Sequence, residues 1–404
     1  MESYFLDWAN LLLRWLHVIT AVAWIGASFY FVFLDSNLES DAAPNQGPGG
    51  AGGIWSVHGG GFYNARKWMH SPPGVAGHLH WFYWESYATW ISGFLLLAVS
   101  YLWHAGAYLI DITVFAWQSP SLAAASAVGF LIGFWLLYDQ ICRIGRRLAL
   151  SDRTIGLMTA LAVVELAYWA TQIFSGRAAF LITGAMMATA MSANVLFWII
   201  PGQRKMVAVM RAGEPMDPEP GLIGKQRSIH NTYFTLPVIL TMLSNHYGFL
   251  TQHEQRFLLL VLLMAAGAAI RVYFVQRHAW HRGRGGNPIW VAVAGVALVL
   301  AAIAVATPKQ TFRAGSATGL SGGSALVPPA IMTIAQRHCL QCHGPAVQMK
   351  GLRLDGPQAW LDHAGAIHQQ VVISQAMPMG NSTGMTAQER QIVASWFKSI
   401  STSK

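Results

Sequence analysis

The sequence predicts an all-α protein: a polytopic bundle of about eight transmembrane helices, followed by a small helical domain. Three observations predict this. Charged residues make up only 11% of the 404 residues, against about 25% in soluble domains, and the mean hydropathy is +0.38. Apolar stretches of about 20 residues recur along most of the chain. After residue 306 the composition changes to one rich in Gly, Ser and Ala.

Each apolar stretch is long enough to be a candidate membrane helix, because about 20 residues of helix span the hydrocarbon core. The stretches are Leu11–Leu34, Trp81–Trp103, Ser121–Tyr138, Gly156–Phe174, Ala178–Ile200, Thr232–Leu250, Phe257–Tyr273 and Ile289–Ala306. The shortest of them are also compatible with buried or re-entrant helices. No cleavable signal peptide is expected, because the first stretch is too long for one.

The basic residues between these stretches predict the orientation. Most lie in the first, third, fifth and seventh connections: Arg66, Lys67, Arg143, Arg146, Arg147, Arg153, Arg204, Lys205, Arg211, Lys225, Arg227, Arg277, Arg282 and Arg284. The second, fourth and sixth connections carry only Arg177 and Arg256. Cationic loops stay in the cytoplasm. We therefore expect a multi-pass protein of the bacterial inner membrane with both termini on the periplasmic side. The net charge of +9 reflects this orientation and does not indicate nucleic-acid binding.

The chain is expected to divide into a membrane domain, residues 1–306, and a C-terminal domain, residues 329–404. Between them, residues 307–328 have no apolar period and predict a flexible linker. In the C-terminal domain, residues 331–338 and 386–400 are expected to be helical. So short a domain buries too little apolar surface to be stable without help.

Near the C-terminus stands the sequence Cys339-Leu340-Gln341-Cys342-His343. C-x-x-C-H is the attachment pattern of a c-type haem. The two thiols add to the porphyrin vinyl groups, and the imidazole of His343 ligates the iron. A zinc site would need further Cys or His at short spacing, and the only other cysteine, Cys142, lies far upstream. The motif predicts a covalent haem c on the periplasmic side and a cytochrome c domain.

The second axial ligand of this haem is expected in the stretch 375–380, which contains two methionines. A thioether is a soft ligand that raises the haem potential. Met377 is the preferred candidate because it precedes a proline, with Met379 second. If neither methionine binds iron, His363 and His368 remain as alternatives.

Two histidines in the membrane domain are candidate ligands for a b-type haem. Ionisable side chains inside a membrane are costly and are functional candidates by default. His17 lies about six residues into the first apolar stretch and His246 four residues before the end of the sixth, so both are expected at a similar depth near the outer face. Paired imidazoles on two helices of a bundle hold haem in this way. The alternative is that both are structural histidines bonded to the backbone or to each other.

A second group of polar residues is expected near the inner face. His80 precedes Glu85 by a little over one helical turn at the start of the second apolar stretch, and His58 lies in a glycine-rich loop, residues 56–63. These residues could move protons, and glycine allows close approach of the backbone to a ligand. We expect His80, Glu85 and His58 to contribute to a substrate pocket. The competing interpretations are an aromatic membrane belt and a second b-type haem held by His80 and His230.

Four stretches of the sequence resemble a known family. LHVITAVAWIGASFYF (16–31), WSVHGGGFY (55–63), LHWFYWESYATWISGF (79–94) and HNTYFTLPVILTMLSNHY (230–247) are similar to the membrane-bound bacterial urate oxidases, or urate hydroxylases. In that family an eight-helix membrane domain is fused to a C-terminal cytochrome c. The resemblance covers the whole chain. It implies oxidation of urate to 5-hydroxyisourate, with electrons passed to the respiratory chain through an acceptor such as a soluble cytochrome c or a terminal oxidase, and no hydrogen peroxide formed.

Two other classes of function remain open from the sequence. One is a non-catalytic electron conduit of the cytochrome b/c kind, and the other is a haem-handling membrane protein. The chemistry of urate favours an enzyme with two carriers, because a two-electron oxidation must deliver its electrons to haem one at a time. A substrate site at the inner face would also require electrons to cross roughly 30 Å of hydrocarbon, which is the physical reason to expect haem b within the bundle.

Overall fold

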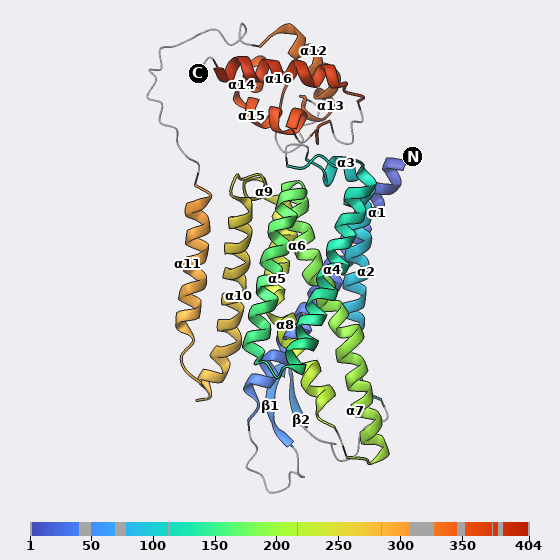
Figure 1. Ribbon diagram of the computed structural model, residues 1–404, viewed down its shortest axis with the longest axis vertical. Helices are drawn as coiled ribbons and strands as arrows, with labels where there is room; N and C mark the ends of the chain where they lie inside the picture. Colours follow the sequence, from blue (N-terminus) through green and yellow to red (C-terminus); the bar gives the residue numbers. More distant parts are fainter. Residues whose placement is uncertain are drawn as a thin grey trace. The chain divides into compact units, whose positions relative to one another are not determined.

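Helices make up nearly all the secondary structure in the computed structural model (Figure 1). The structure describes residues 2–39, 50–68, 78–111, 114–215, 217–283, 285–307, 327–345, 352–373, 375–378 and 383–402. The chain divides into two compact units. One comprises Met1–Ser100, Ala125–Thr171 and Gly176–Thr307, and the other comprises Tyr101–Ala124, Gln172–Ser175 and Pro308–Lys404.

Up to residue 307, most of the described elements are long helices, and a β-hairpin follows the first of them. In chain order they are α1 (Glu2–Asn37), β1 (Gly50–His58), β2 (Gly61–Trp68), α2 (Trp84–Leu97), a π-helical turn (Ala98–Leu102), α3 (Ala105–Tyr108), α4 (Pro120–Arg147), α5 (Asp152–Ile173), α6 (Gly176–Asn194), a π-helical turn (Val195–Ile199), α7 (Ile200–Ala212), α8 (Glu219–Leu243), a 3₁₀ turn (Ser244–His246), α9 (Gly248–Thr251), α10 (Arg256–His281) and α11 (Ile289–Val305).

Every one of the eight apolar stretches is largely helical in the structure. Among the described residues, five helices are long and apolar enough to cross a membrane: Tyr4–Asn37, Pro120–Arg147, Asp152–Ile173, Gly176–Ala212 and Arg256–His281. Ile289–Val305 is apolar but shorter. These helices fit a membrane protein. The helices α2 and α8 fall outside this set because α2 gives way to a π-helical turn after 14 residues and α8 carries several buried polar side chains.

The loop expected between the first two apolar stretches is a β-hairpin. Strands β1 and β2 pair antiparallel, with His58 opposite Gly61 across a two-residue turn. Both turn residues, Gly59 and Gly60, have positive φ, +58° and +80°. Two successive positive φ values are the requirement of the type I′ turn that matches strand twist, and Gly-Gly meets it without strain. The glycines of this segment therefore shape a turn, and the two strands extend away from it.

The core of the first unit lies where α4, α5, α6, α8 and α10 meet. Helix α6 is buried on nearly all sides, as expected for a helix surrounded by others. Its neighbours include α8, and α8 also packs against α10. The apolar core residues are Phe134, Tyr138, Cys142, Ile155, Val163, Ala167, Phe180, Met186, Met187, Ala190, Met191, Phe234, Leu260 and Met264. Helix α1 packs along α2 and also contacts α10.

Short helices enclose a separate core near the C-terminus. They are α12 (Pro329–His338), α13 (Leu340–His343), α14 (Pro357–Asp362), α15 (Ala364–Ile367), a π-helical turn (His368–Ile373) and α16 (Ala387–Thr402). Trp360 and Trp396 meet edge to face in this core, with ring centroids 5.6 Å apart. The helices expected at 331–338 and 386–400 are confirmed as α12 and α16.

Candidate functional site

The C-x-x-C-H residues lie together at the junction of α12 and α13. Cys339 ends α12 and is partly buried, whereas Cys342 on α13 is exposed, and both thiols are free of disulfide bonds. The Nδ1–H of His343 donates a hydrogen bond to the backbone carbonyl of Leu352 at 3.4 Å. This contact fixes the tautomer and leaves Nε2 as the available ligand atom, as is usual for metal-bound histidine. The donor set therefore fits a covalent haem.

The surroundings of Cys339 favour a protonated thiol. Burial raises the pKa of the Cys339 thiol to about 11, with the neighbouring Cys342 adding to the effect. The protonated thiol is not the form that binds zinc, because a zinc site requires thiolates. In the part of the chain that the structure describes, no group of three or more His, Cys, Asp or Glu is arranged to hold a metal ion, so the motif is not part of a larger zinc cluster there.

Met377, the preferred second ligand, is held by its backbone at the edge of the C-terminal core. Its N–H donates to the carbonyl of Gln370 at 3.0 Å, and its own carbonyl accepts a hydrogen bond from Arg390 at 2.8 Å. Its side chain packs against the core cluster. Met379, the second candidate, lies outside the described residues. Of the two histidines kept as alternatives, His363 is exposed and His368 stacks on Phe397, with ring centroids 4.2 Å apart.

His17 bonds the backbone of α2, which is the contact expected of a structural histidine and which also leaves one ring nitrogen for a ligand. It points from α1 to α2, where its Nδ1–H donates to the carbonyl of Thr89 at 3.0 Å and lies 3.2 Å from the hydroxyl of Ser92. The ring lies against Gly93, where an added Cβ would come within 2.7 Å of its Cε1. As in His343, one ring nitrogen is occupied by a backbone carbonyl, and Nε2 is left for another partner.

His246, the expected partner of His17, does not lie within a long helix. Helix α8 ends at Leu243, and His246 closes the 3₁₀ turn that follows, with its side chain exposed. The sequence placed it four residues inside a helix because the apolar stretch continues to Leu250. The structure breaks that stretch into α8, the turn and α9.

The three candidate catalytic residues occupy different surroundings. His80 precedes α2, which begins at Trp84 rather than at the histidine, and its exposed ring contacts Phe82 at a centroid distance of 4.5 Å. His58 is exposed at the end of β1. Glu85 lies in the first turn of α2, and its Oε2 atom is buried without a hydrogen-bond partner among the described residues. Of the three, only Glu85 presents a buried and unpartnered polar atom.

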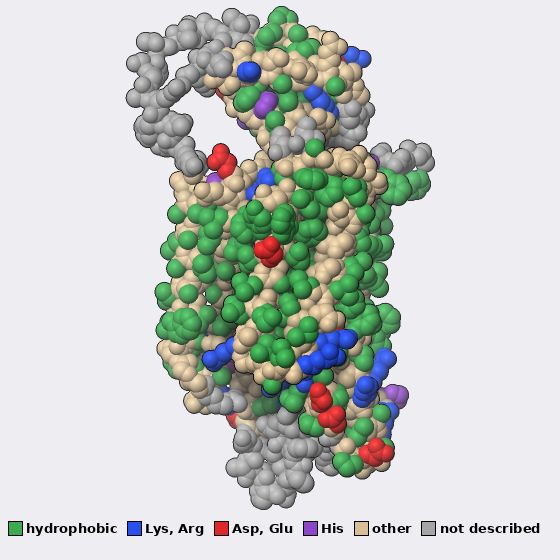
Figure 2. Space-filling model, viewed as in Figure 1, with side chains coloured by type: hydrophobic (Ala, Val, Ile, Leu, Met, Phe, Trp, Pro, Cys, Tyr) green, Lys and Arg blue, Asp and Glu red, His purple; other side chains and the backbone are tan. Residues whose placement is uncertain are grey.

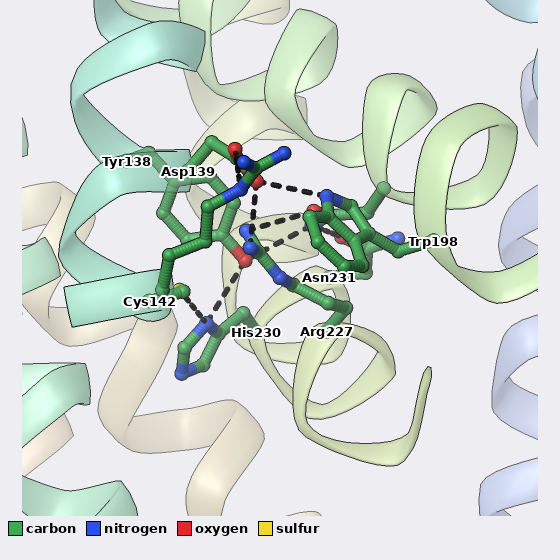
Figure 3. A network of polar contacts seen from close by, with 9 residues as sticks. Tyr138, Asp139, Cys142, Trp198, Arg227, His230 and Asn231 are labelled. Carbon is green, nitrogen blue, oxygen red and sulfur yellow. Dashed lines mark hydrogen bonds and ion pairs between the residues drawn. The ribbon is translucent and has the colours of Figure 1, made fainter. Parts of the chain in front are cut away.

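The structure also contains a buried polar network that the sequence interpretation did not find (Figure 3). Tyr138 on α4 lies 2.9 Å from Nδ1 of His230 on α8, and its hydroxyl accepts a hydrogen bond from Asn194 at 3.0 Å. The same Asn194 amide donates to Asn231 at 2.8 Å. His230 precedes the apolar stretch Thr232–Leu250, but α8 begins at Glu219, so His230 lies within the helix and is buried. Its Tyr138 contact makes this histidine part of the network.

An ion pair adjoins this network. Arg227 on α8 bonds Asp139 on α4 at 2.7 Å, and the two side chains are only 2% and 7% exposed. Asp139 also bonds Arg143 and accepts a hydrogen bond from the indole N–H of Trp198, at 2.7 Å and 2.8 Å. Figure 3 shows the two charged groups facing each other, with the indole beside them. The residues come from sequence positions almost 90 apart, so one sequence gave no signal for the pairing.

Comparison with known proteins identifies one family. A sequence model described as the N-terminal region of urate oxidase matches residues 3–307, which include α1 to α11. The C-x-x-C-H motif lies beyond this match. Neither a curated protein nor a solved structure gives a significant match to the chain.

Proposed function

Because the chain belongs to the urate oxidase N-terminal family, we propose that its membrane domain oxidises urate to 5-hydroxyisourate. The electrons pass to a c-type haem held by Cys339, Cys342 and His343 and then to a respiratory-chain acceptor, such as a soluble cytochrome c or a terminal oxidase, without formation of hydrogen peroxide. The observation that carries this proposal is the family match across residues 3–307 in a chain that continues into a C-x-x-C-H motif.

The proposed reaction balances without dioxygen. Urate and water give 5-hydroxyisourate, two protons and two electrons. Water supplies the oxygen atom of the new C5–O bond, so dioxygen is not needed as a source of oxygen. The protein must then provide a group that takes a proton from water and a route for the electrons. When bound, haem c accepts one electron at a time and passes it on.

Glu85 is the strongest candidate for the proton acceptor. Its Oε2 atom is buried and has no hydrogen-bond partner in the described structure, so one acceptor position of the carboxylate is not used by the protein. A positioned carboxylate of this kind can act as a general base. His80 and His58 are exposed, and we assign them to the movement of protons between this carboxylate and solvent.

Cys339, Cys342 and His343 would hold haem c, and Met377 would complete the iron ligands. His343 is oriented by the Leu352 carbonyl, and Met377 is the proposed second ligand, whose backbone is held by Gln370 and Arg390. A methionine sulfur favours a high potential, which suits a haem that receives electrons from an organic substrate. We propose His17 and His246 as the ligands of a haem b. His17 suits this role because Nδ1 bonds the Thr89 carbonyl and Nε2 faces away from that bond, whereas His246 lies in the exposed turn after α8.

The membrane arrangement proposed is eight spans with both termini and the cytochrome c domain in the periplasm. Hydrophobic side chains cover most of the visible face of the helical bundle, and its Lys and Arg side chains gather towards one end (Figure 2). The last turn of α4 carries Arg146 and Arg147, and Arg204 and Lys205 are exposed on α7. The positive-inside rule assigns this end to the cytoplasm.

Turnover by the purified full-length protein tests this function. We expect urate to be converted to 5-hydroxyisourate without dioxygen when ferricyanide is supplied as a one-electron acceptor. In air, the same preparation should form no hydrogen peroxide. Cys342→Ser is the matched variant, because it removes one haem attachment and should stop transfer to ferricyanide. Urate consumption that requires dioxygen and releases peroxide would contradict the proposal.

A further inference from the structure

A second arginine buried in the bundle, Arg271, has no anionic partner among the described residues. It lies in the middle of α10, 15 residues after the first residue of the helix, and is 6% exposed. Its Nε and Nη2 atoms are buried and make no hydrogen bond in the described structure. The contrast with Arg227 is direct, because that equally buried arginine is paired with Asp139 at 2.7 Å.

An aromatic ring lies against the guanidinium of Arg271. Its Cζ atom lies 3.7 Å from the ring centroid of Phe29 on α1. A desolvated cation–π contact stabilises the charged guanidinium. Taking an ion out of water, however, costs more than one such contact returns. The ring contact offsets only part of that cost, so an anion is needed to complete the site.

The positions of the two unpartnered nitrogen atoms indicate what shape of anion fits the site. In a guanidinium group, Nε–H and one Nη2–H lie on the same edge and point the same way, which forms a planar fork for two neighbouring acceptor atoms. The urate monoanion is planar and presents carbonyl oxygens beside ring nitrogens. A single-point anion such as chloride would leave one of the two donors unsatisfied.

We propose that Arg271 binds the anionic edge of urate through its Nε and Nη2 atoms. This inference rests on the proposed function and names the group that recognises the substrate. Glu85 complements it, because α2 and α10 both pack against α1 and the two helices carry unpartnered groups of opposite charge. Glu85 can accept the proton that water loses when it adds to the ring, and Arg271 can balance the negative charge of the urate anion.

A haem propionate is also an anion with two neighbouring acceptor oxygens. The positions of His17 and Arg271 argue against it. Phe29, against which Arg271 lies, is 12 residues along α1 from His17. At 1.5 Å per residue this is about 18 Å. A porphyrin ligated by His17 would therefore lie well away from the arginine. If Arg271 bound a haem propionate, its substitution would lower the amount of bound haem. If it binds urate, the amount of bound haem should not change.

Equilibrium dialysis of radiolabelled urate against detergent-solubilised protein, with haem kept reduced so that no turnover occurs, tests the proposal. Arg271→Gln should raise the Kd for urate about 10- to 100-fold, the effect of losing hydrogen bonds to a charged group. Arg271→Lys should recover part of the affinity, because it keeps the charge and loses the fork. Arg153→Gln, at an exposed arginine in the first turn of α5, should leave the Kd unchanged.

Thermal unfolding separates recognition from a purely structural role. Without urate, Arg271→Gln should be at least as stable as the wild type, because it removes an uncompensated buried charge, and urate should stabilise only the wild type. A urate affinity within twofold of the wild type, a loss of stability without urate, or a loss of bound haem would overturn the proposal. Wild-type protein that binds no urate would overturn the proposed function as well.

Discussion

The imidazole of His17 lies against Gly93 so closely that a Cβ at residue 93 would come within 2.7 Å of the ring atom Cε1. Helices α1 and α2 therefore meet at a position where only glycine leaves room for the ring. The Thr89 carbonyl, one turn earlier on α2, bonds Nδ1 at 3.0 Å. Together these contacts set the direction in which Nε2 points.

Gly93→Ala is therefore expected to displace the His17 ring and to remove haem b from the membrane domain. The covalent haem c should remain, because its attachment residues lie in a different unit. A pyridine haemochrome assay reports the two haem types separately. Gly129→Ala on α4 is the matched control, since no atom lies within 4 Å of a Cβ added there. Wild-type protein without haem b would refute the ligand role of His17.

Glu85→Gln is expected to lower kcat for urate by about 10²- to 10⁴-fold, because a positioned general base contributes that much. Binding of urate should change much less. The measurement is steady-state urate oxidation with an external acceptor. Glu165→Gln is the control: Glu165 is an exposed carboxylate of a long apolar helix whose Oε1 already accepts a hydrogen bond from Trp169 at 2.8 Å. Normal turnover in Glu85→Gln and in His80→Ala would place the catalytic site elsewhere.

Asp139→Asn should destabilise the membrane domain by about 3–5 kcal/mol, because it leaves the buried charge of Arg227 without its partner. Arg143→Gln, which removes the other arginine bonded to Asp139, should cost no more than about 1 kcal/mol, since that side chain is 48% exposed. Chemical unfolding in mixed micelles gives both values. Equal losses in the free energy of unfolding for the two variants would show that the buried Asp139–Arg227 pair contributes no more than the exposed Asp139–Arg143 pair.

The stability of α16 should depend on pH through Glu389. Bonds from the backbone and hydroxyl of Thr386, and then from His338, lower the pKa of Glu389 from 4.5 to about 2. Because the folded-state pKa is depressed, the stabilisation is complete above the ordinary value and is lost as pH falls from there towards 2. Glu389 also closes a capping box with Thr386 at the helix start.

Hydrogen exchange of the α16 amides, corrected for its intrinsic pH dependence, measures this effect. Glu389→Gln should remove the pH dependence below 4.5, and Thr386→Ala should weaken the helix at all pH values by about 1 kcal/mol. An unchanged pH profile in Glu389→Gln would show that another group titrates in this range.

The sequence was sufficient to predict the helices but not their ends. Apolar stretches mark helices because side chains in lipid or in a helical core must be apolar around the whole circumference. Helix ends depend on local hydrogen bonding instead, so the break after Leu243, which puts His246 in an exposed turn, was missed. The hairpin was also missed, although Gly59-Gly60 between segments with alternating large side chains is a recognisable turn signal.

The candidate site was only partly predictable for a different reason. The C-x-x-C-H motif is local in sequence, so its residues were found directly. Asp139 and Arg227 are 88 residues apart in the sequence, and nothing in a single sequence records such a contact. Arg271 did leave a signal, since it is an ionisable residue inside an apolar stretch. Only the structure, however, shows that Arg271 lacks an anionic partner among the described residues, where Arg227 has one.

Anaerobic mixing of urate with the oxidised full-length protein tests the central claim most directly. The absorbance of the c-type haem reports whether electrons from urate arrive at the iron bound by His343. The account predicts that the ferrous spectrum of haem c appears within the time of a single turnover and that 5-hydroxyisourate accumulates with it. Haem c that stays ferric while urate is consumed, or that is reduced only when quinol is added, would contradict it.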